Sequence, residues 1–284
     1  MGAAFVIALR EGIEAALIVS ILLAYLKQLR RTDRARLVWW GTGLAVALSA
    51  VAGTAIFSFD ADFEGTTEQV FEGVVTLTAV GVLTWMIFWM RRQGARIRSE
   101  LHEKVDTALV AGGLALSSLA FVAVLREGVE TALFLFAATQ GTAVGSGGVG
   151  TQLLGAVFGL GLAVVLGVLL YRGGIRLNLR TFFRLTGGIL IVVAAGLFAY
   201  SVHELQEAGW FPFLGATAFD LSALLPDGSG VGAILRGLVG YNADPTVLET
   251  MAWLVYLIVT GALYLRPVAA LAPRRQAVAD VPDR

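Results

Sequence analysis

The stretch ALREGIEAALIVSILLAY, residues 8–25, decides the fold class of this chain. A bilayer core of about 30 Å requires roughly 20 mostly apolar residues in a helix, and this run is long enough to cross it. Arg10, Glu11 and Glu14 nevertheless lie inside the run. Charged side chains are rare in membrane helices and mark functional sites or buried ion pairs. The stretch therefore predicts a membrane-spanning helix that carries part of a site.

The composition of the whole chain agrees with a membrane protein. Of 284 residues, 57% are hydrophobic and only 15% are charged, and the mean hydropathy is +0.78. A soluble domain usually carries about 25% charged residues. The chain contains no cysteine, which excludes disulfides, thiolate metal sites and cysteine-ligated iron–sulfur clusters.

Apolar runs of spanning length recur along the chain and predict an all-α integral membrane protein with seven transmembrane helices. We expect these helices near 3–27, 37–58, 70–91, 107–139, 150–171, 182–203 and 247–266. The fourth run is longer than one crossing needs, so we expect it to tilt, project or break near Gly112–Gly113 or Ser117–Ser118. Residues 1–267 would form one membrane domain, followed by a short cytoplasmic tail at 268–284.

The charges between these runs predict the orientation. Clusters of lysine and arginine follow the first, third, fifth and seventh runs, whereas the segments after the second and sixth runs are acidic. Loops rich in Lys and Arg stay in the cytoplasm by the positive-inside rule. The N-terminus is therefore predicted to lie outside and the C-terminus inside.

The charged motif of the first run has a second copy. Residues 10–17 read REGIEAAL and residues 126–133 read REGVETAL, six identities in eight positions. On a helix, the Arg and the second Glu of each copy lie one turn apart, and the first Glu lies about 60° from the second. Each helix therefore presents one polar side, formed by Arg10, Glu11 and Glu14 in the first copy and by Arg126, Glu127 and Glu130 in the second.

The two copies are three spans apart, so their helices are predicted to cross the membrane in opposite directions. This predicts an inverted repeat of spans 1–3 and 4–6, about residues 1–91 and 107–207, with the seventh helix at 247–266 outside it. The pseudo-two-fold axis of such a repeat would bring both motifs together near the middle of the membrane.

The motif residues predict a cation path. Four carboxylates and two guanidiniums carry a net charge of minus two when ionised, and carboxylates are hard ligands that suit hard or borderline cations. Insertion scales put each central charge at about 2.5–3.5 kcal/mol, so six cost about 15–20 kcal/mol before pairing, more than helix locking requires. We expect Glu11, Glu14, Glu127 and Glu130 to bind the cation, with Arg10 and Arg126 as supporting ion pairs.

A second acidic group is predicted on the outside. Glu68 and Glu72 lie one turn apart at the start of the third span, and His203, Glu204 and Glu207 lie at the end of the sixth. These five residues could form an outer mouth that concentrates cations by its negative potential. The alternative, that they are solvated loop acids, stays open.

Two R-E-G-x-E motifs, in spans one and four of a seven-span chain with its N-terminus outside, resemble the oxidase-dependent iron permease family. This family includes the fungal high-affinity iron permeases and the bacterial EfeU ferrous iron permeases. The resemblance implies iron import across the plasma membrane, in bacteria the inner membrane, by a protein that is not an enzyme and binds no nucleic acid.

The same resemblance implies what the permease works with. Fe2+ or Fe3+ would be the transported substrate, and no cofactor would be bound permanently. The lipids of the membrane would surround the helices. An extracytoplasmic protein, either cupredoxin-like, a haem peroxidase or a multicopper oxidase, would oxidise or deliver the iron.

Three alternatives stay open at this stage. The chain could be a proton-coupled carrier of a small organic anion bound by Arg10 and Arg126, a permease for another heavy-metal cation such as lead, or a membrane scaffold. Four acids against two bases favour a cation. The sequence leaves open the valence of the ion, the driving force, the choice between channel and alternating access, and the oligomeric state.

Overall fold

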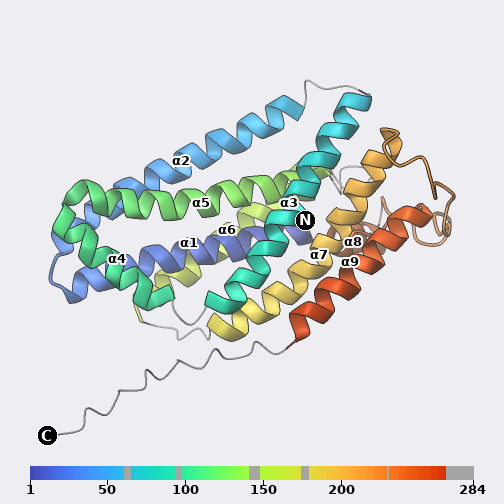
Figure 1. Ribbon diagram of the computed structural model, residues 1–284. Helices are drawn as coiled ribbons and strands as arrows, with labels where there is room; N and C mark the ends of the chain where they lie inside the picture. Colours follow the sequence, from blue (N-terminus) through green and yellow to red (C-terminus); the bar gives the residue numbers. More distant parts are fainter. Residues whose placement is uncertain (61–64, 94–96, 141–147, 174–178, 229, 267–284) are drawn as a thin grey trace, which may run out of the picture.

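The computed structural model describes residues 1–60, 65–93, 97–140, 148–173, 179–228 and 230–266, and this part of the chain is built from helices (Figure 1). One isolated bridge joins Thr217 to Thr246, and the described residues form no strand. The predicted all-α class is confirmed, and the predicted tail at 268–284 lies outside the described residues. The helices are α1 (Gly2–Gln28), α2 (Ala35–Asp60), α3 (Thr66–Gln93), α4 (Ile97–Ala111), α5 (Gly113–Gln140), α6 (Gly148–Tyr171), α7 (Leu179–Glu207), α8 (Gly230–Val239) and α9 (Val247–Leu265), with a 3-10 turn at Thr32–Arg34.

Five of these helices are long and apolar enough to cross a membrane: α2, α3, α6, α7 and α9. The chain is therefore a helical protein with several candidate membrane spans. α1 and α5 have 27 and 28 residues and are also long enough, but each carries the three charges of a motif near its middle. α1 and α5, the two helices that contain the motif copies, are therefore the long apolar helices that do not belong to these five.

The fourth predicted span is two helices. α4 ends at Ala111 and α5 begins at Gly113, and the Gly112 between them has a φ of +113°, in the region that favours glycine. The predicted break at Gly112–Gly113 is thus confirmed, whereas Ser117–Ser118 lies within α5. α4 packs against the C-terminal part of α1, where the Tyr25 hydroxyl donates to Asp106 at 2.8 Å and the Tyr25 ring stacks on His102.

The short helix α8 was not predicted, because its ten residues are too few to cross a membrane. It lies between α7 and α9 in the chain, and its C-terminal end contacts α7, where Gly240 meets the backbone of Gly196. α9 begins after Thr246, whose hydroxyl accepts a hydrogen bond from the backbone N–H of Glu249.

The long helices pack in pairs: α1 along α6, α2 along α5 and α3 along α7, with α9 against α7 (Figure 1). α1 and α5 also contact each other and run in opposite directions, because the start of α1 packs near the end of α5. Two apolar clusters fill the interior. The α7 cluster includes Ala3, Ile7, Leu83, Phe134, Ala138 and Leu190, and the α4 cluster includes Leu22, Leu26, Val38, Val105, Leu116 and Ala120.

The motif residues lie between the two clusters. On α1, Ile7 belongs to the α7 cluster and Ile18 to the α4 cluster, so residues 10–14 fall between them. On α5, Val124 and Phe134 bracket residues 126–130 in the same way. The fold therefore places the charged residues in a polar layer between the two apolar clusters.

Candidate functional site

The first motif copy forms a buried ion-pair group. Arg10 Nη1 lies 2.7 Å from Glu11 Oε1, and Arg10 Nη2 lies 3.1 Å from Glu14 Oε1. Arg10, Glu11 and Glu14 are only 1%, 1% and 4% exposed. A buried guanidinium that faces two carboxylates compensates part of their desolvation cost and fixes their position.

The second copy makes the same pairs in a more open setting. Arg126 Nη2 lies 2.5 Å from Glu127 Oε1, and Arg126 Nε lies 3.7 Å from Glu130 Oε1. The Arg126 side chain is 46% exposed, against 2% for Arg10, although Glu127 is as buried as Glu11. The two copies are thus alike in sequence and pairing but unlike in access.

The two helices bring these carboxylates together. Glu11, Glu14 and Glu127 each offer a carboxylate oxygen, and these three oxygens lie within 4.8 Å of one another. Three carboxylate oxygens at this spacing could bind one metal cation. In the described part of the chain, one carboxylate oxygen each of Glu11, Glu127 and Glu130 is buried and has no hydrogen-bond partner. A buried acceptor without a partner is unusual, and the free lone pairs of these oxygens are available to bind a cation.

The glycine of each motif lets a neighbouring helix approach. A Cβ on Gly12 would lie 2.7 Å from the Cβ of Ala163 on α6, and a Cβ on Gly128 would lie 2.6 Å from the Cβ of Ser49 on α2. Both distances are too short for real atoms, so only glycine permits these contacts. Small residues play this role at helix interfaces in membranes. In both copies, the R-E-G spacing thus places the carboxylates on one side of the helix and the glycine, against which a neighbouring helix packs, on another side.

Two residues beside the motifs were not singled out as site residues in the sequence. Arg10 Nη1 donates to Met86 Sδ at 3.3 Å, so the thioether of α3 reaches the ion-pair group. The Arg126 guanidinium carbon lies 5.2 Å from the centre of the Trp89 ring, a cation–π contact. Both contacts depend on the position of α3 beside the two motif helices.

The five predicted mouth residues lie at the end of the molecule where α3 begins and α7 ends. Glu72 is buried and accepts hydrogen bonds from Gln140 Nε2 of α5 and from the Tyr200 hydroxyl of α7. Glu204 is half-buried within electrostatic reach of Tyr200, His203 and Glu68, and Glu68 itself is exposed.

His203 connects two further acids in this region. Its Nε2 lies 3.4 Å from Glu207 Oε1, and its Nδ1 lies 3.4 Å from Glu249 Oε2. Glu249 is buried and also accepts from Asn242 Nδ2. Gln140, Tyr200 and Glu249 were missed in the sequence, although Glu249 had a signal as an acid in the first turn of an apolar helix. We call Glu72, Gln140, Tyr200, His203, Glu207 and Glu249 the end cluster.

The end cluster and the motif residues are separate. On α5, Phe134 lies between Glu130 and Gln140, and on α3, Leu83 lies between Glu72 and Met86. Phe134, Leu83 and Ile7 are fully buried members of the α7 cluster. The predicted mouth therefore faces the motif site across apolar packing.

Comparison with known proteins completes the description of the site. A model described as the iron permease FTR1 family matches residues 1–277. The ferrous iron permease EfeU of Escherichia coli O6:K15:H31 (strain 536) is 42% identical over 277 residues, covering 96% of this chain and 99% of the relative. The protein of the same name from Yersinia pestis is 38% identical over 271 residues, covering 94% of each chain. No solved structure matches this chain.

Proposed function

Because the chain belongs to the iron permease FTR1 family, it is a permease that transports iron, and we propose that the four motif glutamates carry the ion across the membrane. The family is one of transporters and not of enzymes, and the relatives are bacterial. The chain is accordingly a multi-pass protein of the bacterial inner membrane.

The observation that carries the proposal is the convergence of Glu11, Glu14 and Glu127, whose oxygens lie within 4.8 Å of one another. Iron is a hard to borderline cation and accepts carboxylate oxygens as ligands. With Glu130 and the two arginines, the group has a net charge of minus two when all six are ionised, which one Fe2+ would neutralise. Fe3+ would need one further negative charge, for example a bound hydroxide.

The site lies near the middle of both helices. Glu11 is nine residues from the start of α1 and Glu127 is 13 residues from the end of α5, or about 14 and 20 Å at 1.5 Å per residue. We propose that α1 and α5 also cross the membrane, which gives seven spans with the N-terminus outside and the C-terminus inside.

An inverted repeat is supported by the pairing of the helices. The most extensive contacts are those of α1 with α6, α2 with α5 and α3 with α7. A two-fold axis would exchange α1 with α5, α2 with α6 and α3 with α7. This exchange turns the α1–α6 pair into the α5–α2 pair and leaves the α3–α7 pair unchanged. The motif glycines follow the same exchange, because Gly12 packs on α6 and Gly128 packs on α2. We therefore propose that the two halves of the site are related by a pseudo-two-fold axis.

We propose the end cluster, with Glu68 and Glu204, as the outer mouth from which iron enters. Its acids would raise the local concentration of a cation outside the membrane. An extracytoplasmic protein that oxidises or delivers iron would supply it, as the family resemblance implies. A small organic anion fits the motif site less well, because both terminal nitrogens of Arg10 are already paired with carboxylates.

Uptake by purified protein in liposomes tests the proposal. Radioactive Fe2+ and Fe3+ are offered separately, with Mn2+, Zn2+ and Pb2+ as competitors. We expect Glu14→Gln and Glu130→Gln to abolish iron uptake at equal reconstitution, whereas Glu103→Gln, at an exposed position of α4, retains it. Normal uptake by both motif variants would refute the assignment of the motif glutamates, and the competitors show how strongly the site prefers iron over Mn2+, Zn2+ and Pb2+.

A further inference from the structure

A cavity of about 240 Å³ opens beside the motif site, on the side of α4. Its walls include Glu14 of α1, Trp89 of α3, Leu101 and Lys104 of α4, and Ala123 and Arg126 of α5. Glu14 and Arg126 belong to the motifs, so the cavity reaches the ion-pair groups directly. Lys104 is exposed, so the cavity extends from the motif site to the surface of the molecule at α4.

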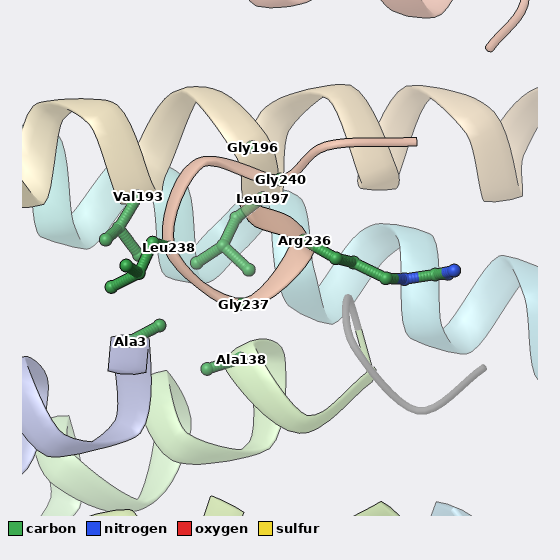
Figure 2. A pocket seen from close by; sticks show the side chains of 9 residues that line it. All are labelled: Ala3, Ala138, Val193, Gly196, Leu197, Arg236, Gly237, Leu238 and Gly240. Carbon is green, nitrogen blue, oxygen red and sulfur yellow. The ribbon is translucent and has the colours of Figure 1, made fainter. Parts of the chain in front are cut away.

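On the opposite side of the motif site, the described residues are tightly packed. Ile7, Leu83 and Phe134 are fully buried there, and a cavity of about 20 Å³ lies beyond them, while the larger cavity at the start of α1 has no motif residue in its walls. Figure 2 shows the small cavity, where Gly237 and Leu238 of α8 lie over Ala3 of α1 and Ala138 of α5. A space of this size holds about one water molecule, so a hydrated metal ion could not pass through it.

The unequal exposure of the two arginines agrees with one open side. Arg10 pairs with Glu11 and Glu14 and is 2% exposed, whereas Arg126 lines the large cavity and is 46% exposed. A charged side chain at this depth requires either a partner or water, because lipid cannot solvate it. Arg126 has Glu127 as a partner on one side, and water in the large cavity would solvate its exposed half.

We propose that this cavity is the vestibule through which the transported ion leaves the motif site toward the cytoplasm, and that the structure is the state open to that side. This proposal rests on the proposed function for the cargo and for the orientation of the chain. Arg126 borders the exit, between the vestibule and the carboxylates of Glu127 and Glu130, and the Trp89 ring supports its guanidinium. Beyond Glu14, the charged groups of the wall are Lys104 and Arg126, and their positive charge gives a cation that has left the carboxylates no second binding site in the vestibule.

Single cysteines test the vestibule, since the chain has no cysteine of its own. Ala123 lines the vestibule and Ala138 lines the small cavity, and both belong to α5, so Ala123→Cys and Ala138→Cys form a matched pair. The reagent is an anionic, membrane-impermeant methanethiosulfonate, which suits the positive wall. It is added to inside-out membrane vesicles and to intact cells, and the extent of modification is measured by mass spectrometry of the protein. Ser222→Cys, at an exposed position between α7 and α8, reports which face is outside.

We expect Ala123→Cys to react only from the face opposite Ser222→Cys, and about tenfold or more faster than Ala138→Cys, whose modification requires local opening. Equal rates for Ala123→Cys and Ala138→Cys would overturn the proposal, as would labelling of Ala138→Cys alone. If Ala123→Cys folds poorly, Leu119→Cys lines the same wall, and its protection from both faces would also overturn it. Labelling of Ser222→Cys from the cytoplasm would refute the orientation in the proposed function, while the Ala123–Ala138 comparison still decides which side is open.

Discussion

Removing the arginine of one motif copy at a time should lower the stability of the fold by different amounts. In Arg10→Met, the side chain keeps its length but loses its charge, and the carboxylates of Glu11 and Glu14 remain buried without their partner. In Arg126→Met, the lost guanidinium is half exposed and water can replace much of it. We expect Arg10→Met to destabilise the fold more than Arg126→Met, because the loss of Arg10 leaves two buried carboxylates without a partner in a setting that water does not reach.

The size of the difference follows from burial. Breaking a fully buried ion pair from one side costs about 3–5 kcal/mol, whereas a pair exposed on both sides contributes about 0–1 kcal/mol. The Arg126 pair lies between these cases, because Arg126 is half exposed and Glu127 is buried, so its loss should cost about 1–3 kcal/mol. At about 2–4 °C per kcal/mol for a chain of this order of size, Arg10→Met should lower the Tm by about 6–20 °C and Arg126→Met by about 2–12 °C.

The assay is thermal unfolding of the purified protein in one detergent at one pH, followed by tryptophan fluorescence. Arg31→Met, at an exposed position beyond α1, controls for the general loss of a positive charge and should leave the Tm unchanged. Equal losses of Tm in Arg10→Met and Arg126→Met, or a larger loss in Arg126→Met, would refute the inference that access divides the two copies.

Two further predictions concern packing and the end cluster. Gly128→Ala should lower stability by about 1–3 kcal/mol, because its methyl group would overlap Ser49, and Gly43→Ala, which faces open space, should be neutral or slightly stabilising in the same melt. Tyr200→Phe removes a hydroxyl that donates to buried Glu72 and should cost about 1–3 kcal/mol; a Tm equal to that of the parent would contradict this role for the hydroxyl.

Much of the fold could be predicted because its signals are local. Runs of apolar residues long enough to cross a bilayer predicted helices, and each of these runs lies in helical structure, with the break at Gly112 set by the positive φ that glycine alone adopts easily. α8 could not be predicted in this way, because its ten residues are mostly apolar but too few to cross a membrane.

The candidate site was predictable only in part. The helical spacing of Arg10, Glu11 and Glu14 places them on one side of α1 whatever surrounds the helix. Met86 carries no such signal, since a methionine in an apolar span is usually packing, and its contact with Arg10 depends on where α3 lies. Glu249 is similar, because its pairing with His203 joins two helices that are distant in the sequence.

The sequence by itself determined that two nearly identical charged motifs lie in two long apolar helices, since the motif and the apolar runs are properties of neighbouring residues. Only the tertiary structure decided that the two copies differ: Arg10 is enclosed, whereas Arg126 borders a cavity that reaches α4. The physical reason is that the burial of a residue and its access to water depend on which helices pack around it. Two segments of nearly the same sequence can therefore have different surroundings for their charged side chains.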